Sequence, residues 1–223
     1  MVKVISFCLW GIEKKYSIGA IKNADLAKIY YPDFECWFYI HKFTVEENII
    51  NELNKKSNVK IIFKEGDLTS SKPMMWRFEP VLDSTVEIMM SRDTDTRILL
   101  REKLAVDEWI NSDKIFHIMR DHPYHCNNIL GGMWGMKANN LTNWKELMDN
   151  VKQYSHRDYD QNFTSNVIYP IYKNFSIIHA SYHKKEPCAK SFPIQYEQTL
   201  NFVGEYVFED ETRIKEHYSL CGN

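Results

Sequence analysis

Two aspartates separated by one residue are the clearest chemical feature of this sequence. Asp93 and Asp95 directly follow an apolar run in EIMMSRDTDTR that is typical of a buried strand. Residues i and i+2 of an extended chain point to the same side, and ligands of open α/β sheets collect at the carboxyl ends of strands. The pair could therefore face one divalent cation that keeps further positions for phosphate oxygens. A solvated polar turn is the alternative for so short a pattern.

Other residue types could line a pocket beside these aspartates. Gly131 and Gly132 lack side chains and would let the backbone approach a bulky ligand, or would simply form a turn. Asp160 and Gln161 fall in the first turn of an expected helix, so they point into the pocket or serve the helix terminus. Arg77 could pair with a phosphate or balance a carboxylate.

Strand and helix patterns alternate along the chain and would position these residues. Strands are expected at residues 2–10, 35–41, 60–64, 86–91, 114–120 and 175–179, and a strand or loop at 129–137. Helices are expected at residues 17–31, 72–82, 100–110, 144–154 and 159–171, and another after a capping box at 44–47. This alternation predicts one α/β domain over residues 1–223, with a mostly parallel central sheet flanked by helices. An irregular tail from about residue 187 is expected to wrap it.

Composition narrows the class of protein. The 223 residues carry 28 basic and 30 acidic side chains and are 44% hydrophobic, which excludes disordered and low-complexity classes. Without a basic surplus, nucleic acid is not an expected partner. No apolar run approaches the roughly 18 residues of a membrane span, and the five cysteines contain no CxxC pair. We therefore expect a cytoplasmic protein, in the host cytoplasm if viral, without a membrane span.

An ordered set of motifs resembles a known family. The set runs through FCLWG-x4-YSIGAIKNA, MMWRF, SRDTDTR, FHIMRDHPYHCNNILGGMWGMK, YDQNF and IIHAS, and covers most of residues 2–183. It resembles nucleotide-sugar-dependent glycosyltransferases of the GT-A fold, especially the small single-domain kind found in bacteria and large DNA viruses. The resemblance implies metal-dependent transfer of a sugar from a nucleoside-diphosphate-sugar donor, by family habit a UDP-sugar, to a hydroxyl acceptor on a glycan or other molecule. It also implies Mn²⁺ (or Mg²⁺) as cofactor.

The resemblance also implies a third metal ligand. A late histidine often completes the metal site of these enzymes beside the aspartate pair, and His179 is the candidate, with His183, His122 and His125 as competitors. The resembling sequences lead us to expect an acid immediately after that histidine, whereas this chain has Ala180. An imidazole ligand beside two carboxylates favours manganese or another transition metal.

Donor contacts and a catalytic role follow from the same resemblance. Asp160 would contact a donor or acceptor hydroxyl and could be the catalytic carboxylate, and Gly132 would lie against the donor sugar. The residues expected to bind the donor, with the base near the end of the first strand, are Phe7, Leu9, Gly11, Tyr16, Arg77, Asp93, Thr94, Asp95, Gly131, Gly132 and Gln161.

Two other functions remain open on the sequence. DxD followed by Thr also matches the nucleophile loop of haloacid-dehalogenase-like phosphatases, where the first aspartate takes the phosphoryl group. Those enzymes usually carry the motif on their first strand, and no later acidic pair of the GDxxxD kind is present here. A nucleotide- or carbohydrate-binding module without turnover is the non-enzymatic alternative.

Overall fold

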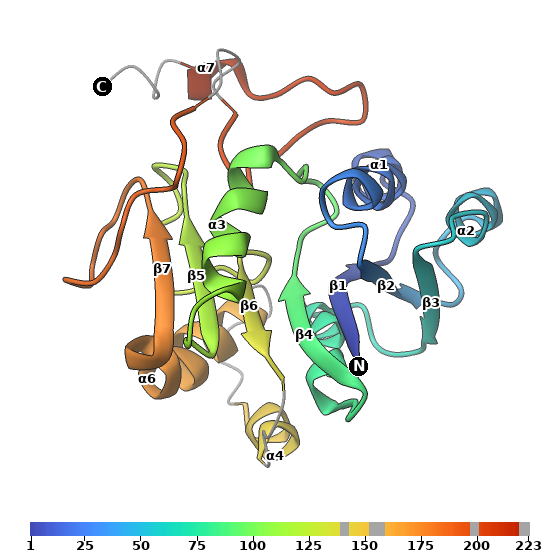
Figure 1. Ribbon diagram of the computed structural model, residues 1–223. Coiled ribbons are helices and arrows are strands. Elements are labelled where there is room, and N and C mark those ends of the chain that lie inside the picture. Colours follow the sequence, from blue (N-terminus) through green and yellow to red (C-terminus); the bar gives the residue numbers. More distant parts are fainter. Residues whose placement is uncertain (139–142, 152–158, 197–200, 219–223) are drawn as a thin grey trace.

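The computed structural model describes residues 1–138, 143–151, 159–196 and 201–218. In this part of the chain one sheet has the strand order β3-β2-β1-β4-β6-β5-β7 (Figure 1). The strands are β1 (Val2–Leu9), β2 (Phe34–His41), β3 (Val59–Lys64), β4 (Val86–Ser91), β5 (Phe116–Arg120), β6 (Trp134–Lys137) and β7 (Ser176–Ala180). The expected strand positions are confirmed to within a few residues at each end, and residues 129–133 form a loop that leads into β6.

The sheet is parallel except at β6, which runs antiparallel to both β4 and β5. This confirms a mostly parallel central sheet in an α/β domain. Because Ser91 at the end of β4 pairs with Trp134 at the start of β6, the loop that precedes Trp134 lies beside the residues that follow Ser91. Because β6 runs antiparallel to β4, Gly131 and Gly132 lie beside Asp93 and Asp95.

Helices cover both faces of the sheet. On one face lie α1 (Lys14–Tyr30), α2 (Glu47–Asn54) and α3 (Leu100–Ile110), whose buried residues form one hydrophobic cluster with Ile5 and Phe7 of β1. The elements on the other face are the 3-10 helix η1 (Lys72–Leu82), α4 (Trp144–Asp149), α5 (Tyr159–Asn162), the π-helix η2 (Phe163–Ile168) and α6 (Tyr169–Tyr172). The short elements η3 (Lys173–Phe175) and α7 (Lys215–Tyr218) follow later in the chain.

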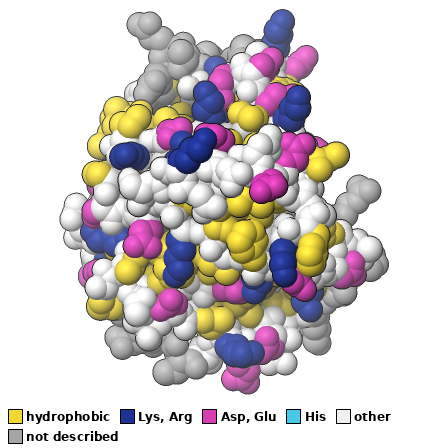
Figure 2. All heavy atoms as spheres, turned by 90° about the vertical axis from the view of Figure 1, so that its right-hand side faces the viewer, with side chains coloured by type: hydrophobic (Ala, Val, Ile, Leu, Met, Phe, Trp, Pro, Cys, Tyr) yellow, Lys and Arg dark blue, Asp and Glu magenta, His cyan; other side chains and the backbone are white. Residues whose placement is uncertain are grey.

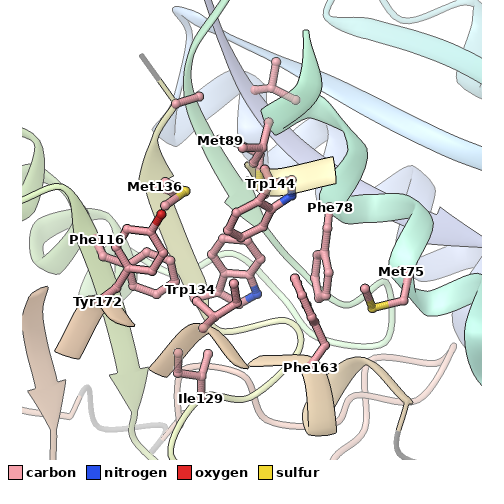
Figure 3. Packing of buried hydrophobic residues seen from close by; sticks show 14 of the residues in the cluster. Met75, Phe78, Met89, Phe116, Ile129, Trp134, Met136, Trp144, Phe163 and Tyr172 are labelled. Atoms are coloured by element: carbon pink, nitrogen blue, oxygen red, sulfur yellow. The ribbon is translucent and has the colours of Figure 1, made fainter. Parts of the chain in front are cut away.

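Aromatic packing anchors β6 and the glycine loop that precedes it. The fully buried ring of Trp134 stacks on Phe116, with centroids 5.1 Å apart, and meets Phe78 edge-on at 5.0 Å (Figure 3). Trp144 and Phe163 close the cluster around the same ring. Truncating an aromatic ring in such a core to Ala typically costs about 3–5 kcal/mol, so the start of β6 is held firmly.

The expected capping box before α2 does not form. The helix begins at Glu47 with no side-chain cap, and the Thr44 hydroxyl accepts a hydrogen bond from the Gly11 backbone N–H at 3.0 Å instead. The same hydroxyl lies 3.0 Å from Nδ1 of His41. Thr44 is thus used to hold the loop after β1.

Two expected helices have a different backbone from the simple prediction. Residues 72–82 form a 3-10 helix that contains Pro80, which has no N–H to donate to an α-helical ladder. The helix expected at 159–171 contains a π-helical middle part just before Pro170, whose missing N–H would have bonded to the Asn166 carbonyl. The expected helix at 144–154 ends at Asp149, and residues 152–154 lie outside the described residues.

The C-terminal segment crosses the carboxyl ends of the parallel strands, as the red part of the ribbon shows in Figure 1. The Val207 N–H donates to the Asp95 carbonyl at 2.8 Å, and Glu211 pairs with Arg97 at 2.9 Å. Helix α7 is short, and no helix among the described residues has the length and apolarity to cross a bilayer. On the face drawn in Figure 2, described Lys/Arg and Asp/Glu side chains lie interspersed.

Candidate functional site

A pocket of about 600 Å³ opens at the carboxyl ends of β1 and β4. Ten of the residues predicted to form the site line it, namely Leu9, Gly11, Tyr16, Arg77, Asp93, Thr94, Asp95, Gly131, Asp160 and Gln161. Residues not predicted to form the site also line it, among them Cys8, Glu13, Met74, Met133 and Gly204. Residues from six separate stretches of the chain therefore meet here. Phe7, Gly132 and His179 are not among the lining residues.

A buried arginine holds two of the acidic side chains in the pocket. One terminal nitrogen of Arg77 donates to Asp160 Oδ2 at 2.6 Å, and the other donates to Asp93 Oδ1. The Arg77 and Asp160 side chains are each only 3% exposed. Both terminal nitrogens are thus committed to carboxylates, so the predicted phosphate contact through Arg77 would have to be shared with these ion pairs.

The two glycines lie directly beneath this arrangement. A Cβ on Gly131 would overlap Asp160 Oδ2 and an Arg77 terminal nitrogen, and a Cβ on Gly132 would overlap the Asp93 carboxylate. The close approach, rather than an unusual backbone angle, requires glycine at both positions. Gly132 therefore lies against Asp93 and is not among the residues that line the pocket, and its expected contact with a donor sugar stays a prediction.

Helix α1 fixes the backbone of the aspartate loop. The Asn23 side chain donates to the carbonyls of Thr94 and Thr96, at 3.3 and 2.8 Å, and accepts from the Ile98 N–H at 3.1 Å. A Cβ on Gly19 would overlap the Thr94 carbonyl oxygen, so the helix sits as close to this loop as backbone allows. These contacts hold the loop while leaving the aspartate side chains to the pocket.

Asp95 carries negative charge that the surrounding residues compensate poorly. Burial and the neighbouring Asp93 carboxylate raise the pKa of Asp95 to about 6, while Lys15 and Arg77 oppose that rise. Two carboxylates are hard oxygen donors suited to Mg²⁺ or Mn²⁺, which also keep positions for water and phosphate oxygens. A divalent cation would relieve the repulsion between them. The residues present therefore fit such an ion, although no cluster of three or more His, Cys, Asp or Glu that could hold one occurs in the described chain.

Asp95 gives the metal-free protein a characteristic pH dependence. Its folded pKa lies above the ordinary value of about 3.9, so the folded state binds more protons between about pH 4 and 6. By linkage, the contribution of Asp95 to the free energy of unfolding is largest at low pH and falls as the pH rises through that window. We expect wild type in EDTA to lose stability relative to Asp95→Asn over this interval. Chemical denaturation of both proteins at pH 4.5 and 7 measures this, and a pH-independent difference would contradict the assignment.

His125 lies in the pocket as a neutral ring. Burial lowers its pKa to about 4, and the Asp93 charge opposes this only in part. Its Nδ1 accepts a hydrogen bond from the His122 backbone N–H at 3.2 Å. The proton of the neutral ring is therefore on Nε2, so His125 is prepared to donate a hydrogen bond rather than to bind a metal through that nitrogen.

His179 makes its hydrogen bonds outside the pocket. It is fully buried in β7, with Nδ1 2.8 Å from His117 Nε2 and Nε2 2.6 Å from Glu108 on α3. Two strands separate β7 from β4, which at ~4.8 Å per strand puts them about 14 Å apart. The structure therefore does not bring His179 to the aspartate pair. The competitor His183 is exposed and contacts the Pro123 carbonyl instead.

Replacing His179 with Ala is thus expected to affect stability rather than metal binding. The change leaves His117, whose Nδ1 already has no partner in the described chain, without its remaining hydrogen bond. We expect a loss of about 1–3 kcal/mol, the typical cost of an unsatisfied buried polar group, and unchanged Mn²⁺-dependent nucleotide affinity. Denaturation and calorimetry would measure the two quantities, with His183→Ala as the exposed control. Loss of Mn²⁺ affinity at wild-type stability would restore His179 as a ligand.

Side-chain alternation explains why Cys8 replaces Phe7 in the pocket. Phe7 faces α1 and α2 and stacks on Phe38 at 4.7 Å, so its side chain lies in the core. Cys8 points to the opposite face, where burial raises the pKa of its thiol to about 12. The period of two along the strand could have identified this difference in advance.

Comparisons with known proteins locate this fold among solved structures. No family model and no curated protein matches the chain. The mannosyltransferase PcManGT from Pyrobaculum calidifontis, solved with GDP-Man and Mn²⁺, is 11% identical with a TM-score of 0.52, and the match covers 81% of this chain and 55% of that one. A glycosyltransferase involved in glycosylation of the major capsid of PBCV-1 is 12% identical with a TM-score of 0.48, and 82% of each chain is covered.

Another solved structure, of a synthase, also matches this chain. The 4-diphosphocytidyl-2C-methyl-D-erythritol synthase from Anaerococcus prevotii is 11% identical with a TM-score of 0.49, and the match covers 84% of this chain and 93% of that one. At these identities the likeness concerns the fold alone. Together with the mixed sheet and its antiparallel β6, the likeness to PcManGT identifies the fold that the motifs implied: this chain has the GT-A fold.

Proposed function

We propose that this protein is a metal-dependent glycosyltransferase that uses a nucleoside-diphosphate-sugar donor, by family habit a UDP-sugar, and a hydroxyl acceptor. One observation carries the proposal: Asp93 and Asp95 line a single pocket with the buried ion pair of Arg77 and Asp160. Such a pocket offers carboxylates for a cation at one point and a separate carboxylate for proton transfer at another.

The aspartate pair would hold Mn²⁺ or Mg²⁺, which supplies charge neutralisation to the departing diphosphate. In the transfer, the acceptor oxygen forms a bond to the anomeric carbon of the donor. The bond between that carbon and the diphosphate oxygen breaks, and its electron pair leaves with the diphosphate. The proton of the acceptor hydroxyl passes to Asp160, whose pKa burial raises and thereby makes it a stronger base.

Other residues that line the pocket would bind the nucleoside and the diphosphate of the donor. Leu9, Gly11 and Tyr16 surround the end of β1, where the nucleoside would bind largely through backbone contacts. The Nε2–H of His125 would donate to an oxygen of the diphosphate, because the ring is neutral and its other nitrogen is already bound. Gly131 leaves the room that the Arg77 and Asp160 side chains occupy beside it.

The two alternative functions have no comparable support. A haloacid-dehalogenase-like phosphatase carries its aspartates after the first strand, whereas here they follow β4 in the middle of the sheet. A binding module without turnover would not require a buried carboxylate held toward the ligand. These alternatives predict different products, namely phosphate from a phosphate monoester in the first case and no product in the second.

Thermal shift screening tests the proposal. A ligand that binds only the folded state at 100 times its dissociation constant adds about 2.7 kcal/mol to stability. We expect UDP and UDP-sugars to raise the melting temperature with Mn²⁺ and much less in EDTA. Equal shifts with and without the metal, or none with any nucleoside diphosphate or its sugars, would refute it.

A further inference from the structure

A second recess of about 380 Å³ lies beside the donor pocket and shares Gln161 with it. Its wall is made mostly of amide and hydroxyl side chains, namely Asn127, Asn128, Gln161, Asn162, Ser165 and Asn166. No aromatic or aliphatic side chain is among its described lining residues. We call this the amide recess. Its composition differs from that of the donor pocket, where carboxylates and methionines meet.

The backbone of α5 and η2 aligns these side chains. Gln161 and Ser165 are four residues apart, as are Asn162 and Asn166, and positions four apart lie on the same side of a helix. The π-helical turn of η2 begins between the members of each pair, and such turns occur often at functional sites. One helical face therefore presents four polar groups to the recess.

Hydrogen bonds within the wall leave part of each amide available. Asn127 Nδ2 donates to Gln161 Oε1, which leaves Gln161 Nε2 as a donor and Asn127 Oδ1 as an acceptor. Lys185 donates to the Cys126 carbonyl at 2.6 Å and to Asn128 Oδ1 at 3.0 Å. Both of these oxygens are uncharged, so the one ammonium group in the described wall keeps its charge and one N–H, while the amides supply neutral donors and acceptors.

This chemistry selects one class of ligand. An amide both donates and accepts, as a sugar hydroxyl does, so several amides can satisfy several hydroxyls at once. An anionic ligand is best held by a guanidinium or by several cations, and a lipid would require an apolar wall. The described lining residues include a single exposed lysine, no arginine and no aromatic or aliphatic side chain.

We infer that the amide recess binds the acceptor and that this acceptor is an uncharged saccharide, an inference that rests on the proposed transferase function. Gln161 lines both cavities and directly follows Asp160. A sugar seated in the recess would therefore present a hydroxyl toward the Asp160 carboxylate, which takes its proton while the oxygen bonds to the donor carbon. The recess determines which molecule receives the sugar.

Direct binding to the full chain tests this inference without requiring turnover. Saturation-transfer NMR would compare methyl glycosides of glucose, galactose and mannose with methyl glucuronide, which is anionic, and with 1-butanol, which is apolar. We expect saturation of at least one neutral glycoside. Asn162→Leu and Asn166→Leu should each weaken its binding about tenfold, since each removes a hydrogen-bonding group from the ligand. Asn174→Leu makes the same substitution at an exposed position outside both cavities and should change nothing.

The result separates failure of this inference from failure of the proposed function. Preference for the glucuronide or butanol, no glycoside binding, or Leu variants that bind like wild type would overturn the acceptor assignment. Calorimetry of UDP with Mn²⁺ on the same samples reports on the donor pocket and on folding. If wild type binds neither UDP nor any other nucleoside diphosphate, the transferase is refuted, and glycoside binding that is sensitive to Asn166→Leu would still locate a saccharide site.

Discussion

Replacing Asp93 with Asn is expected to abolish Mn²⁺-dependent binding of UDP while the protein remains folded. The amide keeps the shape of the carboxylate and can still accept from Arg77, which retains its second partner Asp160. It lacks the charge and the paired hard oxygens that a divalent cation requires. We expect the affinity for UDP in the presence of Mn²⁺ to fall at least a hundredfold by calorimetry, and Asp95→Asn should behave similarly.

The matched control is Asp149→Asn, which removes a carboxylate from an exposed pair with Lys145 on α4. That change should leave nucleotide affinity and stability unchanged, because exposed pairs contribute little. Wild-type affinity in Asp93→Asn would remove the aspartate pair from the donor site.

Replacing Arg77 with Met is expected to cause the largest loss of stability. Met fills much of the same volume but leaves the buried carboxylate of Asp160 and the partly exposed carboxylate of Asp93 without their shared counter-charge. Breaking a buried pair by removing one partner typically costs about 3–5 kcal/mol. Chemical denaturation at pH 7 measures the loss. Lys145→Met, which breaks an exposed pair, should cost less than about 1 kcal/mol.

The pH dependence of this loss gives a second check. Without Arg77, the rise in the pKa of Asp160 that burial and Asp93 cause loses its main opposition, and the Gln161 backbone hydrogen bond remains to lower that pKa. A raised folded pKa means that protonation at lower pH relieves the destabilisation. The difference from wild type should therefore shrink between pH 7 and pH 4.5. A difference that stays constant would mean that lost packing, not unpaired charge, destabilises the variant.

Much of the fold could be predicted because the sequence alternates clearly between strand and helix periods. The expected bounds of β4 at 86–91 and of α3 at 100–110 match the structure residue for residue. Hydrogen bonding that depends on neighbours in space could not be predicted this way. Thr44 has the right spacing for a capping box, yet its hydroxyl is taken by the Gly11 N–H from the loop after β1.

The site was predictable where it depends on short sequence spacing. Asp93 and Asp95 follow a buried strand, so their position at the carboxyl end of that strand follows from the pattern alone. The order of strands does not, because periodicity cannot tell that β5 and β6 separate β7 from β4. His179 was therefore expected beside the aspartates, whereas His125 lies in the pocket, from a loop whose course no pattern indicated.

The most direct test of the proposed function is the release of UDP from UDP-sugars by the purified protein. We expect release that requires Mn²⁺ or Mg²⁺, stops in EDTA, is lost in Asp93→Asn, and accelerates when an uncharged saccharide is added. Binding of UDP-sugars without any release, under the same conditions and with the same saccharides, would contradict the assignment of Asp160 and its pocket to sugar transfer.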